Sequence, residues 1–180
     1  MSTAYIALGS NMASAAGPPD ATLAAAARRL GKLGTVTTRS SLYSTRPVGF
    51  AAQPRFMNAV AALETVLDPR TLLNQLLAIE KEFGRDRSKS IPNGPRTLDL
   101  DILLMDDLVI REPGLELPHP RLDQRVFVLV PLNEIAPQLK IAYNGKTVGQ
   151  MLEDLHQTQA GDTDAVVRME SDHWRAAAEV

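Results

Sequence analysis

The strongest constraint on the fold of this chain is the order of its patterned segments. That order is strand, helix, strand, strand, helix, strand over residues 3–104. Apolar residues recur at helical spacing in two segments, while the others are short runs rich in apolar and β-branched residues. The order predicts a ferredoxin-like α+β fold, an αβ sandwich in which helices pack on the faces of a mainly antiparallel sheet.

Turn and capping residues set the expected boundaries of these segments. Asp20 and Asp68 are expected to cap the two helices at their N-termini, and Pro69 strengthens the second start. Gly34 and Gly84 are expected to end these helices. The expected strands cover 3–8, 35–43, 55–65 and 97–104.

The pattern weakens after residue 104. The segment 125–136 is compatible with either a strand or a helix, because its apolar run has no decisive period. We expect a single domain over 1–155, followed by an extension of unassigned role over 156–180. Other expected features are a turn at Asp106 and Asp107, short strands near Val109 and Leu115, a hairpin at Asn144-Gly145 and a short helix over 149–156.

Composition excludes several classes of protein. The chain has no cysteine, which rules out disulfides, thiolate metal sites and cysteine nucleophiles. Its net charge of −2 makes it a poor candidate for nonspecific nucleic-acid binding. The N-terminus lacks the pattern of a secretory signal, and no apolar run is long enough to span a membrane. We therefore expect a cytoplasmic monomer with no nucleic-acid or membrane partner.

Two aspartates in the last of these strands are the main candidates for chemistry. Asp99 and Asp101 are two residues apart and so point to the same face, while Leu98, Leu100 and Ile102 alternate into the core. Adjacent carboxylates repel each other unless a cation or a proton lies between them. Oxygen ligands of this kind suit Mg²⁺. The alternative is that both aspartates are simply solvated on an exposed strand face.

Arginines near these aspartates favour phosphate chemistry. Arg96 precedes the pair by a few residues, and carboxylates for a metal beside a guanidinium for phosphate are typical of phosphoryl transfer. Arg85 and Arg87 could also clamp phosphate oxygens, but taken alone they fit a solvated helix end as well. Arg125 is open to the same two interpretations.

Three further residues could bind a ligand. His119 lies between two prolines, where it could donate to a phosphate or only stabilise its loop. Phe56 and Asn58 share a strand face, which suits a flat heterocycle with a hydrogen-bonding edge. The alternative for Phe56 is a place in the apolar core.

Together these segments resemble the family of 6-hydroxymethyl-7,8-dihydropterin pyrophosphokinases, from Ala4 to about Leu152. Residues 94–102, Gly-Pro-Arg-Thr-Leu-Asp-Leu-Asp-Ile, are the most specific marker. The other markers are Ala-Tyr-Ile-Ala-Leu-Gly-Ser-Asn at 4–11, Tyr-Ser-Thr-Arg-Pro-Val-Gly at 43–49, Phe-Met-Asn-Ala at 56–59, Ile-Glu at 79–80, Gly-Arg-Asp-Arg at 84–87, Leu-Pro-His-Pro-Arg-Leu at 117–122 and Val-Pro-Leu-Asn-Glu-Ile-Ala-Pro at 130–137.

The resemblance implies an ATP- and Mg²⁺-dependent transferase of folate biosynthesis. The hydroxymethyl oxygen of the pterin would attack the β-phosphorus of ATP, and AMP would leave. Asp99 and Asp101 would hold two Mg²⁺ ions. By resemblance, the catalytic residues are Arg85, Arg96, Asp99 and Asp101, the ATP-binding residues are Glu80, Arg87, Arg96, Ile102, His119 and Arg125, and the pterin-binding residues are Thr45, Val48, Phe56, Asn58 and Phe127.

The sequence also departs from the family pattern. Pro92 and Asn93 stand where an arginine and a tryptophan are common, so a lid over ATP would use other residues, with Lys89 as one candidate. Leu77 replaces a common glutamine, which puts the adenine contacts in doubt. Two rival functions stay open on residues alone, a ligand-binding module and a two-metal nuclease or phosphohydrolase. The first would not need a metal-phosphate site, and the second would be expected to show more metal ligands and a basic surface.

Overall fold

A computed structural model describes residues 1–158 and 165–178, while residues 159–164 and 179–180 lie outside the description. The predicted extension over 156–180 therefore falls partly outside it. The strands are β1 (Ser2–Ser10), β2 (Thr35–Arg39), β3 (Leu42–Thr45), β4 (Phe56–Thr65), β5 (Asp99–Met105), β6 (Ile110–Glu112), β7 (Leu115–Leu117) and β8 (Val166–Met169). The helices are α1 (Pro19–Leu30), α2 (Pro69–Glu82), the 3-10 turn η1 (Leu122–Gln124), α3 (Val126–Ile135), α4 (Val148–Thr158) and α5 (Asp172–Ala176).

The main sheet has the strand order β5-β1-β4-β3-β8, and β2 also pairs with β4. Every pairing in it is antiparallel. In chain order, β1, α1, β2 with β3, β4, α2 and β5 form the predicted ferredoxin-like unit, which is confirmed. The short strands β6 and β7 form a separate hairpin, as expected near Val109 and Leu115.

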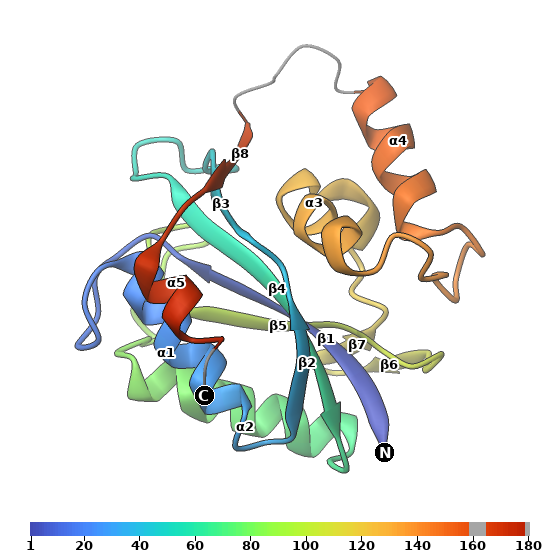
Figure 1. Ribbon diagram of the computed structural model, residues 1–180, viewed down its shortest axis with the longest axis horizontal. Helices are drawn as coiled ribbons and strands as arrows, with labels where there is room; N and C mark the ends of the chain where they lie inside the picture. The colour runs from blue at the N-terminus through green and yellow to red at the C-terminus, as the bar shows by residue number, and fades with distance from the viewer. Residues whose placement is uncertain (159–164, 179–180) are drawn as a thin grey trace.

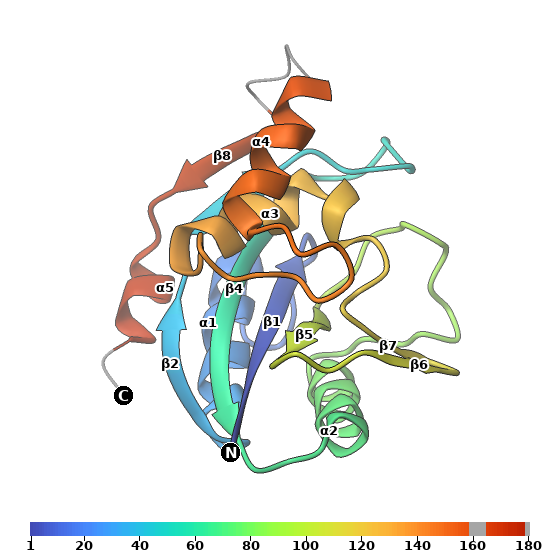
Figure 2. The same ribbon diagram turned by 90° about the vertical axis from the view of Figure 1, so that its right-hand side faces the viewer.

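Helices cover both faces of the sheet. Helices α1 and α2 lie on one face, with α5 beside α1, and helices α3 and α4 lie on the other face (Figures 1 and 2). Each layer buries its own apolar cluster against the sheet. Among the described residues, no helix is both long and apolar enough to cross a membrane.

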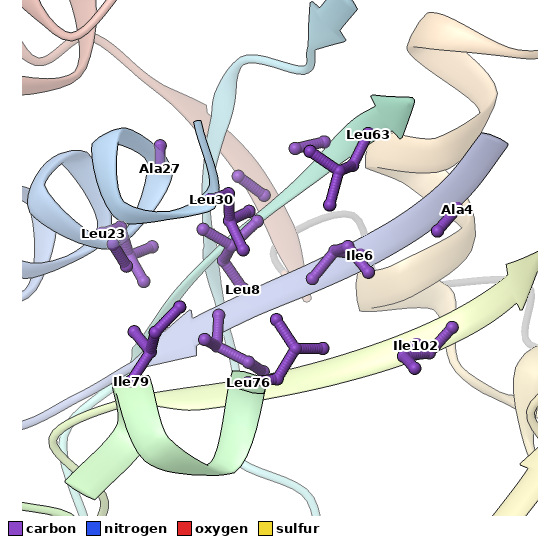
Figure 3. Close-up of a cluster of buried hydrophobic side chains, with 14 of the residues drawn as sticks. Ala4, Ile6, Leu8, Leu23, Ala27, Leu30, Leu63, Leu76, Ile79 and Ile102 are labelled. Atoms are coloured by element: carbon purple, nitrogen blue, oxygen red, sulfur yellow. The ribbon is translucent and has the colours of Figure 1, made fainter. Parts of the chain in front are cut away.

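Strand β1 shows how the sequence pattern builds the two cores. Its residues Ala4, Ile6 and Leu8 are 0%, 0% and 1% exposed and pack under α1 and α2 (Figure 3). Tyr5 and Ala7 point to the other face, where α3 and α4 cover them. Complete burial of a leucine or isoleucine side chain is worth roughly 1.5–3 kcal/mol. Successive side chains of β1 thus point to opposite faces of the sheet and pack against a different layer of helices on each face.

Two of the expected caps of the first helix are wrong. Helix α1 starts at Pro19 after Pro18, and Asp20 lies inside its first turn. The helix ends at Leu30 with Gly31 as its cap, three residues before Gly34. Gly34 is needed for a different reason, because a Cβ at that position would lie 2.1 Å from the carbonyl oxygen of Glu64. The chain passes there against β4 too closely for any side chain.

The second helix begins as predicted. Asp68 caps α2 by accepting a hydrogen bond from the backbone N–H of Thr71 at 3.0 Å, and Pro69 occupies the first turn. The helix ends at Glu82, and Gly84 follows with a φ of +84°, a conformation that suits glycine.

The strand expected over 35–43 is divided into β2 and β3 at Ser40 and Ser41. Glu134 at the end of α3 accepts hydrogen bonds from the backbone N–H and hydroxyl of Ser41 and, at 2.6 Å, from the Tyr43 hydroxyl. Burial and this carboxylate raise the pKa of Tyr43 to about 12. The end of α3 is therefore hydrogen-bonded to the chain at the break between β2 and β3.

The structure resolves the ambiguous segment 125–136 as helix α3, even though Pro131 lies within it. Val128, Leu129 and Leu132 are buried between the sheet and α4. The hairpin expected at Asn144-Gly145 is reduced to one bridge between Lys140 and Thr147. Helix α4 begins at Val148, close to the expected start.

Candidate functional site

A cavity of about 480 Å³ lies where the ends of β3, β4 and β5 meet the start of α3. Figure 2 shows the loops that follow β3 and α2 projecting on one side of the molecule. Eight of the residues predicted from sequence line the cavity, namely Thr45, Val48, Phe56, Asn58, Arg96, Asp99, Arg125 and Phe127. The fold thus brings all five predicted pterin-binding residues into one space with Arg96, Asp99 and Arg125. The other predicted residues are not part of this lining, namely Glu80, Arg85, Arg87, Asp101, Ile102 and His119.

Polar groups on two neighbouring strands form one wall of the cavity. Asn58 on β4 donates from Nδ2 to the Thr45 hydroxyl on β3 at 2.6 Å. This bond orients the amide and leaves its oxygen as an acceptor. Gly9 on β1 makes room for the amide, since a Cβ there would lie 2.9 Å from Asn58 Oδ1. The glycine that interrupts the first apolar run therefore has a steric role in the cavity.

Two aromatic rings line the same space from different elements. Phe56 comes from β4, belongs to neither apolar cluster and lines the cavity, so the core alternative is wrong for this residue. Phe127 comes from the first turn of α3. A guanidinium lies 5.7 Å from the centre of each ring, that of Arg96 near Phe56 and that of Arg125 near Phe127. Each ring thus combines an apolar face with a neighbouring cation.

The aspartate pair lies on β5 beside β1, where Asp99 pairs with Gly9 and Asp101 with Ala7. Arginines surround Asp99. Its carboxylate lies 2.9 Å from Arg96, 3.7 Å from Arg85 and 4.0 Å from Arg87, measured between the charged atoms. The predicted grouping of Arg85, Arg87 and Arg96 around this strand is therefore present in the structure, with the Arg87 side chain 53% exposed.

Asp101 differs from Asp99 in its surroundings. Its carboxylate accepts no hydrogen bond from any described residue. Burial and then the charge of Asp99 raise the pKa of Asp101 to about 6, although Arg125 acts in the opposite direction. A partly buried carboxylate that accepts no hydrogen bond and lies beside a like charge would be stabilised by a bound cation, and this donor set fits a divalent metal ion.

The described residues supply no third group to this pair. Within 1–158 and 165–178, no group of three or more acidic or histidine side chains is arranged so that it could hold a metal ion. Any metal held by Asp99 and Asp101 would therefore complete its shell with water and substrate oxygens, which is the usual situation for Mg²⁺.

Glu80 and Ile102, both predicted to contact ATP, lie in the interior. Glu80 is 1% exposed, and its carboxylate accepts hydrogen bonds from Arg87 and from the backbone N–H of Leu100 at 2.9 Å. Burial raises the pKa of Glu80, while Leu100 and Arg87 oppose this shift. Ile102 is 5% exposed and belongs to the core under α2. Glu80 thus fixes Arg87 to β5, and the side chain of Ile102 is committed to packing.

His119 follows the end of β7 and is tied to β5 through its backbone N–H, which donates to the carbonyl of Leu103. Burial, then Arg125 and Arg121, lower the pKa of His119 to about 4. Its Nδ1 accepts a hydrogen bond from the backbone N–H of Arg121 at 3.1 Å. The neutral ring therefore carries its proton on Nε2 and is a donor at neutral pH.

This shift predicts a pH dependence of stability. The folded-state pKa lies below the ordinary value, so the unfolded chain takes up the proton first as pH falls. The resulting loss of stability begins at about pH 6.5 and is complete at about pH 4. For His119→Asn this loss is absent, and between about pH 7 and pH 5 the variant should lose about 1–2 kcal/mol less stability than the unaltered protein.

Urea unfolding at both pH values without metal would measure the difference. The unaltered protein and His119→Asn must be compared because Asp101 changes the free energy of unfolding in the opposite direction as pH falls. Its raised pKa makes the folded state take up a proton first, which adds stability as pH falls below about 6. Equal pH dependence in both proteins would contradict the assignment to His119.

Several residues in or beside the cavity were not predicted from sequence. Asn11 is 4% exposed and exchanges hydrogen bonds with the backbone of Arg96, at 3.1 Å and 2.9 Å. Its Nδ2 also donates to Gln53 Oε1 and to the carbonyl of Pro54. Arg46, Asn93, Arg121, Gln124 and Val126 complete the lining together with Gly9. Only the position of Asn11 in a marker segment could have indicated its role.

In the loop around Lys89, which was predicted to act as a lid, the Lys89 side chain makes few contacts. Among the described residues, the 84% exposed side chain of Lys89 pairs only with Asp86, at 3.4 Å. Asn93, one of the two unusual residues of this loop, has a φ of +56° and lines the cavity. Its carbonyl accepts a hydrogen bond from Gln53 Nε2 at 2.7 Å. The loop thus reaches the cavity through Asn93.

Comparison with known proteins gives a consistent result. Residues 5–137 match the family model described as 7,8-dihydro-6-hydroxymethylpterin-pyrophosphokinase (HPPK). The 2-amino-4-hydroxy-6-hydroxymethyldihydropteridine pyrophosphokinase of Pseudomonas aeruginosa is 45% identical over 148 residues, which is 82% of this chain and 88% of that protein. The protein of the same name from Haemophilus influenzae is 45% identical over 141 residues, 77% of this chain and 84% of that protein.

The fold matches solved structures as well. The wild-type HPPK-DHPS of Plasmodium falciparum superposes with a TM-score of 0.74 at 15% identity, over 94% of this chain and 48% of the longer one. At this identity the similarity concerns the fold alone. It agrees with the ferredoxin-like arrangement described above.

Proposed function

This chain belongs to the 7,8-dihydro-6-hydroxymethylpterin-pyrophosphokinase family, and on that basis we propose the reaction that it carries out. It transfers pyrophosphate from ATP to the hydroxymethyl group of 6-hydroxymethyl-7,8-dihydropterin, releases AMP and so serves folate biosynthesis. ATP as the donor, Mg²⁺ as the required ion and a monomeric, cytoplasmic protein are parts of the same proposal.

The observation that carries this proposal is the composition of one cavity. Phe56, Asn58 and Thr45 line it together with Arg96 and Asp99. The aromatic ring and polar groups of Phe56, Asn58 and Thr45 suit a flat heterocycle. The charges of Arg96 and Asp99 suit a phosphate chain and its metal ion. A cavity with both groups suits a reaction that joins a pterin to a phosphate.

On the pterin side, the two rings are proposed to stack on the substrate. Phe56 and Phe127 reach the cavity from β4 and α3, so a ring between them would contact both. The Asn58 amide, oriented by Thr45, would read the polar edge of the pterin. Val48 is 64% exposed in the loop after β3, where its backbone is available for a further contact.

On the phosphate side, the arginines are proposed to exchange partners. Arg85, Arg87 and Arg96 lie around Asp99 without substrate, and phosphate oxygens would offer them stronger acceptors. The Nε of Arg85 is buried without a hydrogen-bond partner among the described residues, so it can donate to one more ligand atom. Arg125 and the Nε2 proton of His119 would add two donors.

Asp99 and Asp101 are the groups that would hold the metal. Mg²⁺ bound there would neutralise phosphate charge and orient the triphosphate. The described lining of the cavity contains no histidine or lysine, and its one carboxylate, Asp99, lies among arginines, so the chain would contribute mainly by positioning and electrostatic stabilisation.

A product assay tests the proposal. The protein is mixed with ATP, Mg²⁺ and 6-hydroxymethyl-7,8-dihydropterin, and the adenine nucleotides are separated. We expect AMP that depends on the pterin, with no ADP. ADP would indicate an ordinary kinase, and turnover without the pterin would favour a phosphohydrolase. Pterin binding without any turnover would favour the binding-module alternative.

A further inference from the structure

The segment 165–178 lies outside residues 5–137, which match the family model, and is called the C-terminal strap below. Its strand β8 pairs with β3 as the outermost described strand of the sheet, and its helix α5 packs beside α1 (Figure 1). Strand β3 carries Thr45, one of the polar groups of the cavity wall. The strap therefore pairs with the edge of β3 that faces away from β4, and β3 forms one side of the cavity.

Pairing between the strap and β3 continues to the point where β3 ends. Thr45 pairs with Val166, and the backbone N–H of Arg46 donates to the carbonyl of Ala165 at 2.9 Å. On its other side Thr45 pairs with Phe56. Without the strap, β3 would be an edge strand, and its last residues would be held from one side only. Strand ends held in this way open more readily.

Trp174 anchors the strap to the rest of the molecule. It is 7% exposed, and its Nε1 donates to the carbonyl of Ser40 at 2.9 Å. The guanidinium of Arg39 lies 4.4 Å from its ring centre, and Arg39 also donates to the Trp174 carbonyl. A second contact, from the Ser171 hydroxyl to Asp20, ties the start of α5 to α1. These contacts fix the strap close to the break between β2 and β3.

We propose that the C-terminal strap positions the pterin side of the cavity and that Trp174 is its positioning residue. The strap keeps Thr45 where its hydroxyl meets Asn58, and it fixes the first residue of the loop that carries Val48. This inference rests on the proposed function. It also specifies which substrate is affected, because the aspartates lie on β5 at the opposite edge of the sheet from β8.

The register of β8 supplies a matched pair of variants. In an antiparallel ladder, hydrogen-bonded and non-bonded pairs alternate. The bond from Arg46 to Ala165 therefore makes Ser44 and Val167 the next bonded pair, so the N–H of Val167 points towards β3. The N–H of Val166 points away from β3, and proline is tolerated as the first residue of a strand. Val167→Pro breaks the ladder, whereas Val166→Pro keeps it.

The experiment measures KM for the pterin, KM for ATP and kcat for both variants and the unaltered protein. We expect Val167→Pro to raise KM for the pterin about tenfold, with KM for ATP within about twofold of the original value. Val166→Pro should behave like the unaltered protein. If Val167→Pro does not fold, Trp174→Phe replaces it. This change removes one hydrogen bond and should raise KM for the pterin about threefold.

The outcomes separate this inference from the proposed function. An unchanged KM for the pterin in the strap variants, with an active unaltered protein, would overturn the inference alone. Parallel changes in both KM values and kcat would also overturn it, because the strap would then act only on general stability. If the unaltered protein formed no pterin-dependent AMP, the proposed function and the inference would fall together.

Discussion

Replacing Asp101 by asparagine is expected to lower kcat at least about a hundredfold, the magnitude typical of lost electrostatic stabilisation in a transition state. The carboxylate has no hydrogen-bond donor among the described residues, and burial beside Asp99 raises its pKa. An amide of the same size cannot provide the negative charge that a divalent metal needs. The expected loss therefore concerns chemistry and metal affinity, with little effect on packing.

The same change should not destabilise the fold. Because the pKa of Asp101 is raised, the folded protein carries this charge at a cost near neutral pH, and removing it keeps or increases the free energy of unfolding. Asp107→Asn, in the exposed turn after β5, is the matched control and should retain full activity. Turnover of Asp101→Asn within a fewfold of the original would show that the metal assignment is wrong.

Truncating Phe127 to alanine should weaken pterin binding roughly tenfold to a hundredfold and leave ATP binding nearly unchanged. The ring lines the cavity from α3, and base-like rings gain about 1–3 kcal/mol from stacking on one aromatic side chain. The arginines around Asp99 lie on other elements, so they keep their positions in this variant.

Calorimetric titration of each ligand would separate the two effects. Tyr143→Ala, which removes a 44% exposed aromatic ring outside the cavity lining, serves as the control for general destabilisation. Equal weakening of pterin and ATP binding in Phe127→Ala would contradict the assignment of this ring to the pterin.

The fold was predictable where local signals and tertiary packing agree. Asp68 and Pro69 begin α2 as expected, and the alternation of Leu98, Leu100 and Ile102 correctly identified β5. The start of α1 was not predictable in the same way. Asp20 has the chemistry of a cap, but its carboxylate is bonded to Ser171, which lies 151 residues away in sequence. A long-range contact thus took the place of a local one.

Other features depend on partners that a pattern does not reveal. The run 126–132 is apolar throughout because α3 lies between the sheet and α4, and such burial removes the period that separates helix from strand. The C-terminal strap is short, and its order comes from pairing with β3 and from Trp174. Neither arrangement can be recognised from a short stretch of sequence, because each depends on contacts with distant residues.

In the candidate site, too, features set by nearby residues were predictable and features set by distant contacts were not. Asp99 and Asp101 are two residues apart on one strand, so the two-residue repeat was enough to predict that they share a face. Arg96 was placed near them by its closeness in sequence alone. The interior position of Glu80 was not expected, because its hydrogen bond to Leu100 joins α2 to β5. Phe127 could be identified only by resemblance, since its segment had no assigned secondary structure. The roles of all these residues in binding stay predictions.

The contacts of Asn11 and Gln53 have a consequence for how the two substrates influence each other. Asn11 holds the backbone of Arg96 and the side chain of Gln53, and Gln53 holds the carbonyl of Asn93. The loop 46–55 and the loop 83–98 are thus joined by shared bonds. A ligand that orders one loop lowers the entropy cost of ordering the other, and thermodynamic reciprocity requires the same benefit in the reverse direction. We therefore expect the two proposed substrates to bind cooperatively, with one coupling free energy that is common to both.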